Sequence, residues 1–131
     1  MKLPRSKHKF KKLSNDILSW CPHYMGLPRG KNYLPNLKIS RINNVVWSDY
    51  DPSDDTIRVY YNQIKSVNHL VRMIIHEYTH YVQLPSDRQD RLYSKYEKEV
   101  GYWDNPFEVE ARNNEKKYVN HIYYRIKSKK L

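Results

Sequence analysis

Two histidines and a glutamate at a fixed spacing are the residues of this sequence best suited to catalysis. His76 and His80 are four residues apart, and Glu77 directly follows the first histidine. On an α-helix, residues four apart lie on one face, so both imidazoles can bind one metal ion. The Glu77 carboxylate then lies within reach of a water molecule at that ion, where it can act as a general base. The competing interpretation is two helix histidines that only pack or face solvent.

The flanking residues predict the helix that this spacing requires. Apolar side chains recur at intervals of one, three and four residues, which is the periodicity of a buried or amphipathic helix; they are Leu70, Val71, Ile74, Ile75, Tyr78 and Val82. Ser66 or Asn68 is suited to cap the start of this helix. Leu84-Pro85 is suited to end it, because proline disfavours helical geometry in the residue before it.

A third metal ligand is expected downstream, because a catalytic zinc ion commonly has three protein ligands and one open position. No histidine occurs between His80 and His121, and no cysteine follows the motif, which leaves carboxylates. If residues 106–128 form a helix, Glu108 lies on its apolar stripe and points toward the motif helix, whereas Glu110 lies on the opposite, polar face. Glu108 is therefore the predicted ligand.

Two other interpretations of the glutamates stay open. Glu108 lies three residues after Asn105, the expected helix cap, where a glutamate can fold back onto the backbone as a capping box. Glu115 lies on the same apolar stripe, two turns further along. It either orients a histidine by accepting a ring N–H, or binds the metal in place of Glu108.

The rest of the chain must supply the elements that position these residues. We expect a basic arm over residues 1–12, a short helix over about residues 14–21 and a turn-rich loop over residues 22–36. A strand or bent hairpin over residues 37–47, a turn over residues 48–55 and a strand over residues 56–61 should follow. Residues 86–100 predict a charged surface helix that Gly101 ends. Asn105-Pro106 then starts the last helix, which runs to about Ser128. Connections between the strands are too short for helical crossovers, so the predicted fold is one α+β domain over residues 1–131 with an antiparallel or mixed sheet.

The motif and the later segment Asn-Pro-x-Glu-x-Glu-Ala, residues 105–111, together resemble the gluzincin-type zinc metallopeptidases. They are similar to the small single-domain forms found in bacteria and phages, which include the ImmA/IrrE-like proteins. The resemblance covers about residues 62–111. It departs from the usual pattern at Arg112, where these families commonly have Asp or Asn. SprT-like proteases share the motif and a basic character, but their third ligand is a histidine, which this chain lacks nearby.

This resemblance implies a zincin-like fold and a specific reaction. One zinc ion would be held by His76, His80 and Glu108, with Glu77 as the general base for hydrolysis of a peptide bond. The strand over residues 56–61 would be the sheet edge along which an extended protein or peptide substrate pairs. Other divalent ions also accept two imidazoles and a carboxylate. Tyr102 is a candidate donor to the oxyanion, although nothing in the sequence distinguishes it from the other twelve tyrosines.

The charge of the chain suggests a partner. With 24 Lys and Arg against 14 Asp and Glu, the formal net charge is +10, which favours an anionic partner: nucleic acid, a component of a virus particle, a membrane surface or an acidic protein. The competing interpretation is a soluble protein whose surface is simply basic. The alternative to an enzyme is a non-catalytic zincin-fold protein that is structural or associated with nucleic acid or a particle. Its basic segments would be residues 2–12 and 127–130, and salt-dependent DNA binding without proteolysis would favour it.

Composition also bears on the compartment. The single cysteine, Cys21, excludes an internal disulfide framework. No apolar run is long enough to span a bilayer, and the basic N-terminus is not followed by the apolar segment of a secretory signal. We therefore expect a cytoplasmic protein, or one packaged in a virion.

Overall fold

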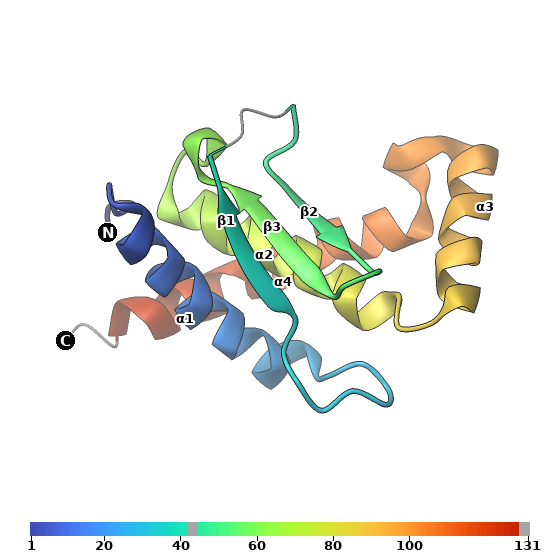
Figure 1. Cartoon of the computed structure of the whole chain (residues 1–131), viewed down its shortest axis with the longest axis horizontal. Helices are drawn as coiled ribbons and strands as arrows, with labels where there is room; N and C mark the ends of the chain where they lie inside the picture. The colour runs from blue at the N-terminus through green and yellow to red at the C-terminus, as the bar shows by residue number, and fades with distance from the viewer. Residues whose placement is uncertain (42–44, 129–131) are drawn as a thin grey trace.

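Helix α2 (Val67–Gln83) lies at the centre of the computed structural model, which describes residues 1–41 and 45–128 (Figure 1). It packs against helices α1 (Lys7–Met25) and α4 (Pro106–Ser128) and against strands β2 (Ser48–Asp51) and β3 (Thr56–Tyr60). Residues 74–81 are all buried, because protein surrounds this part of the helix. Both helix boundaries are as predicted: the Ser66 side chain accepts the His69 backbone N–H at 3.0 Å, and the helix ends at Leu84.

The sheet is mixed, which is one of the two predicted arrangements. Its strands are β1 (Asn36–Ser40), β2 (Ser48–Asp51) and β3 (Thr56–Tyr60), in the spatial order β1-β3-β2. Strand β3 is parallel to β1 and antiparallel to β2.

Two sequence predictions about the sheet are wrong. The segment expected to be only a turn contains β2, whose polar residues are accommodated because Arg58 pairs with Asp49 and Asp51 at 3.1 and 3.3 Å. The strand expected to be the sheet edge is β3, which has a neighbour on each side. Residues 42–44, part of the predicted strand or hairpin over residues 37–47, lie outside the described residues.

Helix α1 (Lys7–Met25) replaces the expected basic arm over residues 7–12 and starts well before the predicted helix. The Ser6 side chain caps it by accepting the Lys9 N–H at 3.2 Å. Phe10 is only 1% exposed and begins the buried stripe that continues through the helix. The helix also extends past Pro22 into the expected loop and ends at Gly26, whose φ of 73° favours glycine.

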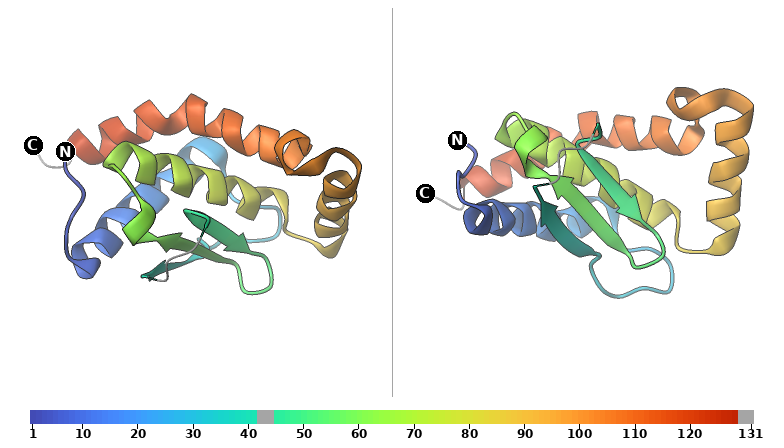
Figure 2. Two further views of the ribbon diagram at one scale, coloured as in Figure 1. Left: turned by 90° about the horizontal axis from the view of Figure 1, so that it is seen from above. Right: turned by 45° about the horizontal axis from the view of Figure 1, so that its top comes forward.

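Helices α3 (Asp87–Asp104) and α4 (Pro106–Ser128) lie where the sequence predicts helices, although α3 continues past Gly101, its expected end, to Asp104. Regular helical geometry in α3 is interrupted at Gly101, where φ is 82°. The Asn105 side chain caps α4 by accepting the Phe107 N–H at 3.0 Å. Helix α4 covers the side of α2 that faces away from the sheet, and α3 projects at one end of the molecule (Figure 2).

The result is a single α+β domain in which α2 lies between the sheet and α4. No helix in the described part of the chain has the length and apolar character needed to cross a membrane.

Candidate metal centre

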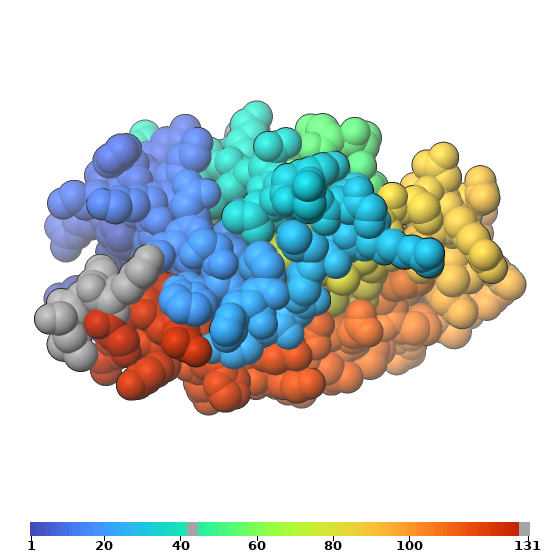
Figure 3. Space-filling view, turned by 90° about the horizontal axis from the view of Figure 1, so that it is seen from below, coloured from blue at the N-terminus to red at the C-terminus, as the bar shows by residue number. Residues whose placement is uncertain are grey.

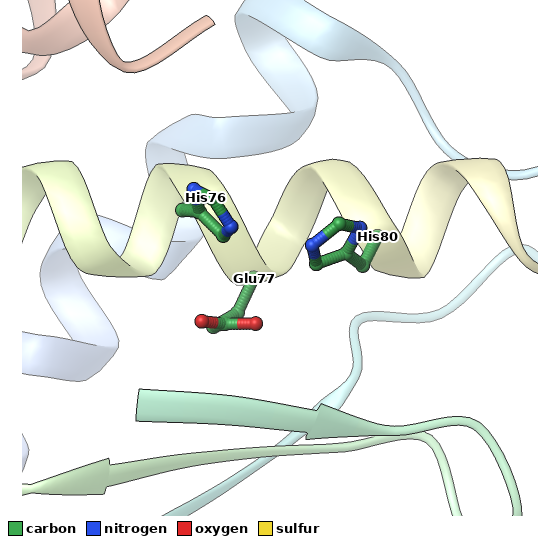
Figure 4. Close-up of side chains that lie close together, drawn as sticks. All are labelled: His76, Glu77 and His80. Carbon is green, nitrogen blue, oxygen red and sulfur yellow. The ribbon is translucent and has the colours of Figure 1, made fainter. Parts of the chain in front are cut away.

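The two motif histidines lie side by side on α2 and are almost fully buried (Figure 4). Their ring centroids are 4.9 Å apart. Glu77 points from the same helix toward the sheet. Together His76, Glu77 and His80 form a buried group whose ligand atoms all lie within 4.8 Å of one another, and which could bind a metal ion.

Glu108 reaches this group from α4. Its Oε1 atom is 2.9 Å from His76 Nε2 and 3.0 Å from His80 Nε2, and the residue is 3% exposed. Glu110 is exposed and contacts Gln83 instead. The capping-box interpretation of Glu108 does not describe the structure, because its carboxylate is directed to the histidines.

The other ring nitrogens of the histidines each have a partner that fixes the ring. His76 Nδ1 is 2.7 Å from Glu115 Oε2, and His80 Nδ1 is 2.9 Å from Gln83 Oε1. The Gln83 amide is oriented by its Nε2, which donates to the Phe107 carbonyl at 3.0 Å, so Oε1 is left as the acceptor. Both Nδ1 atoms therefore donate, and a neutral ring has its lone pair on Nε2.

The resulting set of donors fits a cation. Two Nε2 lone pairs and a Glu108 carboxylate oxygen face one another, so these contacts require either a proton on each ring or a cation among the three atoms. Charge gives the same result. Three glutamates contribute negative charge here: Glu77, Glu108 and Glu115. One of them is paired with a cation, because Arg72 Nε is 3.2 Å from Glu115 Oε1. Two negative charges remain, and one divalent cation would neutralise them.

The pKa values of the two histidines and of Glu108 are shifted in the directions that this excess of negative charge predicts. Burial by itself lowers the pKa of His76, but hydrogen bonds to Glu108 and Glu115 outweigh it and raise that pKa to about 10. The pKa of His80 is raised against the effect of burial in the same way, chiefly by Glu108. Burial raises the pKa of Glu108, yet hydrogen bonds to both histidines hold it well below its usual range. A field that favours a proton on imidazole also favours a metal ion.

Glu77 is positioned from the opposite side, by the sheet. Ser48 donates a hydrogen bond from Oγ to Glu77 Oε2 at 2.6 Å. Ser48 is opposite Val59 in the register of β2 and β3, and side chains of opposed residues lie on one face of a sheet, so the hydroxyl faces α2. Burial raises the pKa of Glu77, while both histidines and Ser48 oppose that shift.

An open cleft of about 280 Å³ lies beside these residues. Strand β2 and helix α3 form its other walls, which include Tyr50, Tyr93 and Tyr102. Tyr93 donates its hydroxyl hydrogen bond to Glu108 Oε2. Burial and the nearby Glu108 raise the pKa of Tyr102, the tyrosine that the sequence had offered as an oxyanion donor.

A second hollow of about 640 Å³ adjoins the cleft and shares His76, Glu77 and Tyr102 with it. Apolar side chains form much of its surface, among them Trp47 and Met73. The two hollows therefore meet at Glu77.

The structure brings together His76, Glu77, His80, Glu108 and Glu115, all of which the sequence singled out. It adds Ser48, Gln83 and Tyr93, which the sequence did not indicate. The spacing of Gln83 from His80, three residues on one helix, was the one local signal available for these three. Ser48 and Tyr93 reach the site only through tertiary packing.

Comparisons with protein-family models, with curated proteins and with solved structures find no match to this chain.

Proposed function

We propose that this protein is a zinc-dependent metallopeptidase of zincin type, with His76, His80 and Glu108 as ligands. The observation that carries this proposal is the convergence of two Nε2 lone pairs and a carboxylate beside a buried Glu77 that faces an open cleft. Zinc bonds of about 2.0–2.2 Å in a tetrahedral arrangement put neighbouring ligand atoms about 3.3–3.5 Å apart. The distances of 2.9 and 3.0 Å between Glu108 Oε1 and the two Nε2 atoms need to expand by only about half an ångström to match.

Zinc with three protein ligands and an open position lowers the pKa of water to about 7 and polarises a carbonyl group. Glu77 is placed to exchange protons in such a reaction. Ser48 holds its Oε2 atom, so Oε1 is the oxygen that takes a proton from the attacking water and passes it to the leaving amine. Glu115 and Gln83 keep both imidazoles in the Nδ1–H form, which directs each Nε2 to the ligand position.

The substrate that fits this cleft is an extended peptide. Strand β2 borders the cleft and, among the described residues, pairs only with β3, so its outer edge can accept a peptide by β-augmentation. This assignment replaces β3, which is central. The adjoining hollow with Trp47 and Met73 suits a bulky apolar side chain on one side of the cleaved bond.

A non-catalytic protein that keeps the metal site as a structural staple is the second candidate. It accounts for the histidines and Glu108, but a staple has no use for a buried carboxylate held by Ser48 at the cleft. The two candidates differ in what Glu77 does, so substitution of that residue separates them.

The test compares wild type, Glu77→Gln, His76→Ala and the control Glu99→Gln, an exposed glutamate of α3. Zinc content is measured by mass spectrometry, and hydrolysis with unfolded fluorogenic protein substrates. We expect one zinc per chain in all variants except His76→Ala, and a loss of hydrolysis in Glu77→Gln of about 10²- to 10⁴-fold. Hydrolysis at the wild-type rate by Glu77→Gln would refute the role of Glu77 as the general base. A zinc-loaded wild type that cleaves nothing would favour the staple.

A further inference from the structure

The positive charge of this protein is concentrated at the two ends of the chain. Residues 1–12 and 116–131 contain twelve of the 24 Lys and Arg residues and no Asp or Glu. The 103 residues between them contain twelve Lys and Arg and all 14 Asp and Glu, which gives a formal charge of −2. The net charge of +10 is therefore a property of the termini and not of the domain as a whole.

The fold brings residues 1–12 and the described end of α4 to one end of the molecule. The start of the chain and the last turns of α4 lie at the same end in each ribbon view, away from α3 (Figures 1 and 2). In the space-filling view, α1 runs beside the end of α4 (Figure 3). Arg125 connects the two helices, since its Nε donates to the Tyr24 hydroxyl at 3.2 Å and its guanidinium lies over the Trp20 ring.

We define the basic pole as the Lys and Arg side chains of residues 2–12 together with Arg125 and Lys127, all of which are exposed. None of the ion pairs in the described part of the chain involves any of them. Lys7, Lys9, Lys11 and Lys12 lie on an α-helix, so their charges are held in place instead of being dispersed along a flexible tail.

This arrangement works against the stability of α1. The first turn of α1 contains no acidic residue, although the positive end of the helix dipole favours negative side chains there and disfavours lysine. Lys7 and Lys11 are also four residues apart, which puts like charges one turn from each other. Local departures from favourable sequence rules are typical of functional positions, and a bound polyanion would relieve both repulsions.

From this placement we propose that the basic pole binds the phosphate backbone of a nucleic acid. A bilayer is the less suitable polyanion, because an interfacial helix inserts an exposed apolar face. The apolar residues of α1 are instead packed in the core, and no large apolar side chain between residues 2 and 26 is exposed. Tyr124, which is 69% exposed and precedes Arg125, adds an aromatic ring of the kind that stacks on unpaired bases.

Binding at this pole leaves the candidate metal centre accessible, because the cleft is lined by residues of α2, β2 and α3, and α4 contributes to it only Glu108, in its first turn. The protein would then act on, or be retained near, proteins bound to the same nucleic acid. This proposal does not depend on catalysis by Glu77, and it can be tested in a variant without zinc.

The test measures binding of the full chain to a fluorescent 20-base-pair DNA duplex and to a single strand of equal length over a range of salt concentrations. The variant K7Q/K9Q/K11Q/K12Q removes four charges from the pole. The matched control R88Q/R91Q/K95Q/K98Q removes four exposed charges from α3, so both variants have the same net charge.

We expect the pole variant to lose at least about tenfold in affinity near 0.1 M salt, and its slope of log K against log salt to become shallower by about 2–4. The control variant should keep the wild-type affinity within about threefold. The melting temperature of the free pole variant should be unchanged or up to about 5 °C higher, because repulsion at the start of α1 is reduced.

Two results would overturn the proposal. Equal losses in both variants would mean that only net charge matters and not the pole. Binding of wild type to phosphatidylserine vesicles but to neither DNA would assign the pole to a membrane surface. A preference for the duplex or for the single strand identifies which backbone the pole fits, and either preference supports the proposal.

Discussion

Glu115 allows the sharpest test of the metal centre, because its two interpretations predict different results for one substitution. Its Oε2 atom is 2.7 Å from His76 Nδ1 and its Oε1 atom is 3.2 Å from Arg72 Nε. If Glu115 orients His76, Glu115→Gln should weaken zinc binding without abolishing it. If Glu115 is itself a ligand, the substitution should remove zinc as completely as Glu108→Ala.

The expected magnitude follows from the hydrogen bond that changes. Glutamine can still accept the His76 N–H, but it replaces a charged acceptor with a neutral one, which lowers the strength of the bond by about 1–1.5 kcal/mol. This corresponds to about a 5- to 15-fold loss in zinc affinity, which overlaps the lower end of the 10- to 100-fold loss typical of residues that orient metal ligands. Arg72 is 44% exposed at its side chain, so its weakened contact adds little.

The assay is competition for zinc against a chromophoric chelator, with Glu99→Gln as the control for charge. We expect about tenfold weaker binding by Glu115→Gln, wild-type affinity in the control, and one zinc per chain in both at saturation. Affinity within twofold of wild type for Glu115→Gln would refute the role of Glu115 as an orienting residue. Stoichiometric loss of zinc would refute the assignment of Glu108 as the third ligand.

Substitutions at three further positions test the surroundings of the site and the stability of the fold. Tyr93→Phe removes a hydroxyl donor to the proposed carboxylate ligand, so zinc affinity measured by the same competition should fall about three- to tenfold; an unchanged affinity would show that this hydrogen bond is not needed. Ser48→Ala should lower kcat about tenfold with zinc content and KM unchanged, because Glu77 loses the hydrogen bond that orients it, and Ser48→Thr should restore the rate. Burial raises the pKa of Asp55, but hydrogen bonds from Lys31 and a tyrosine outweigh burial and lower that pKa overall. The ionised carboxylate therefore stabilises the fold above about pH 4, and this stabilisation is lost as pH falls through the folded-state pKa. The difference in unfolding free energy between wild type and Asp55→Asn should therefore be constant from about pH 7 to 5 and shrink below about pH 4, as urea titrations at each pH would show.

The parts of this fold that the sequence predicted well are those with local signals. Ser66 and Leu84 mark the ends of α2, and Asn105-Pro106 marks the start of α4. Capping residues and proline act on backbone groups within four residues, so they can be recognised without tertiary information. The inward direction of Glu108 followed in the same way from the apolar stripe of one helix.

The predictions that failed are those in which charge concealed a structural pattern. Residues 1–12 looked like a solvated arm because lysine dominates them, although Phe10, Leu13 and Ile17 have helical spacing and are buried. Residues 48–55 looked like a turn because they are acidic and contain Pro52. Their first half, residues 48–51, forms strand β2, in which Asp49 and Asp51 pair with Arg58. This pairing requires β3 beside β2, so it cannot be recognised from residues 48–55 alone.

The same distinction separates the two parts of the candidate site. The candidate metal ligands come from α2 and α4, whose extensive contact is specified by helical stripes in the sequence. The position of Glu77 depends instead on Ser48, which reaches it only because β2 pairs with β3 in one register. A slip of one residue in that pairing would turn Ser48 to the opposite face of the sheet. Changes in the hairpin between β2 and β3 should therefore affect proton transfer while leaving metal binding intact, whereas changes between α2 and α4 should affect both.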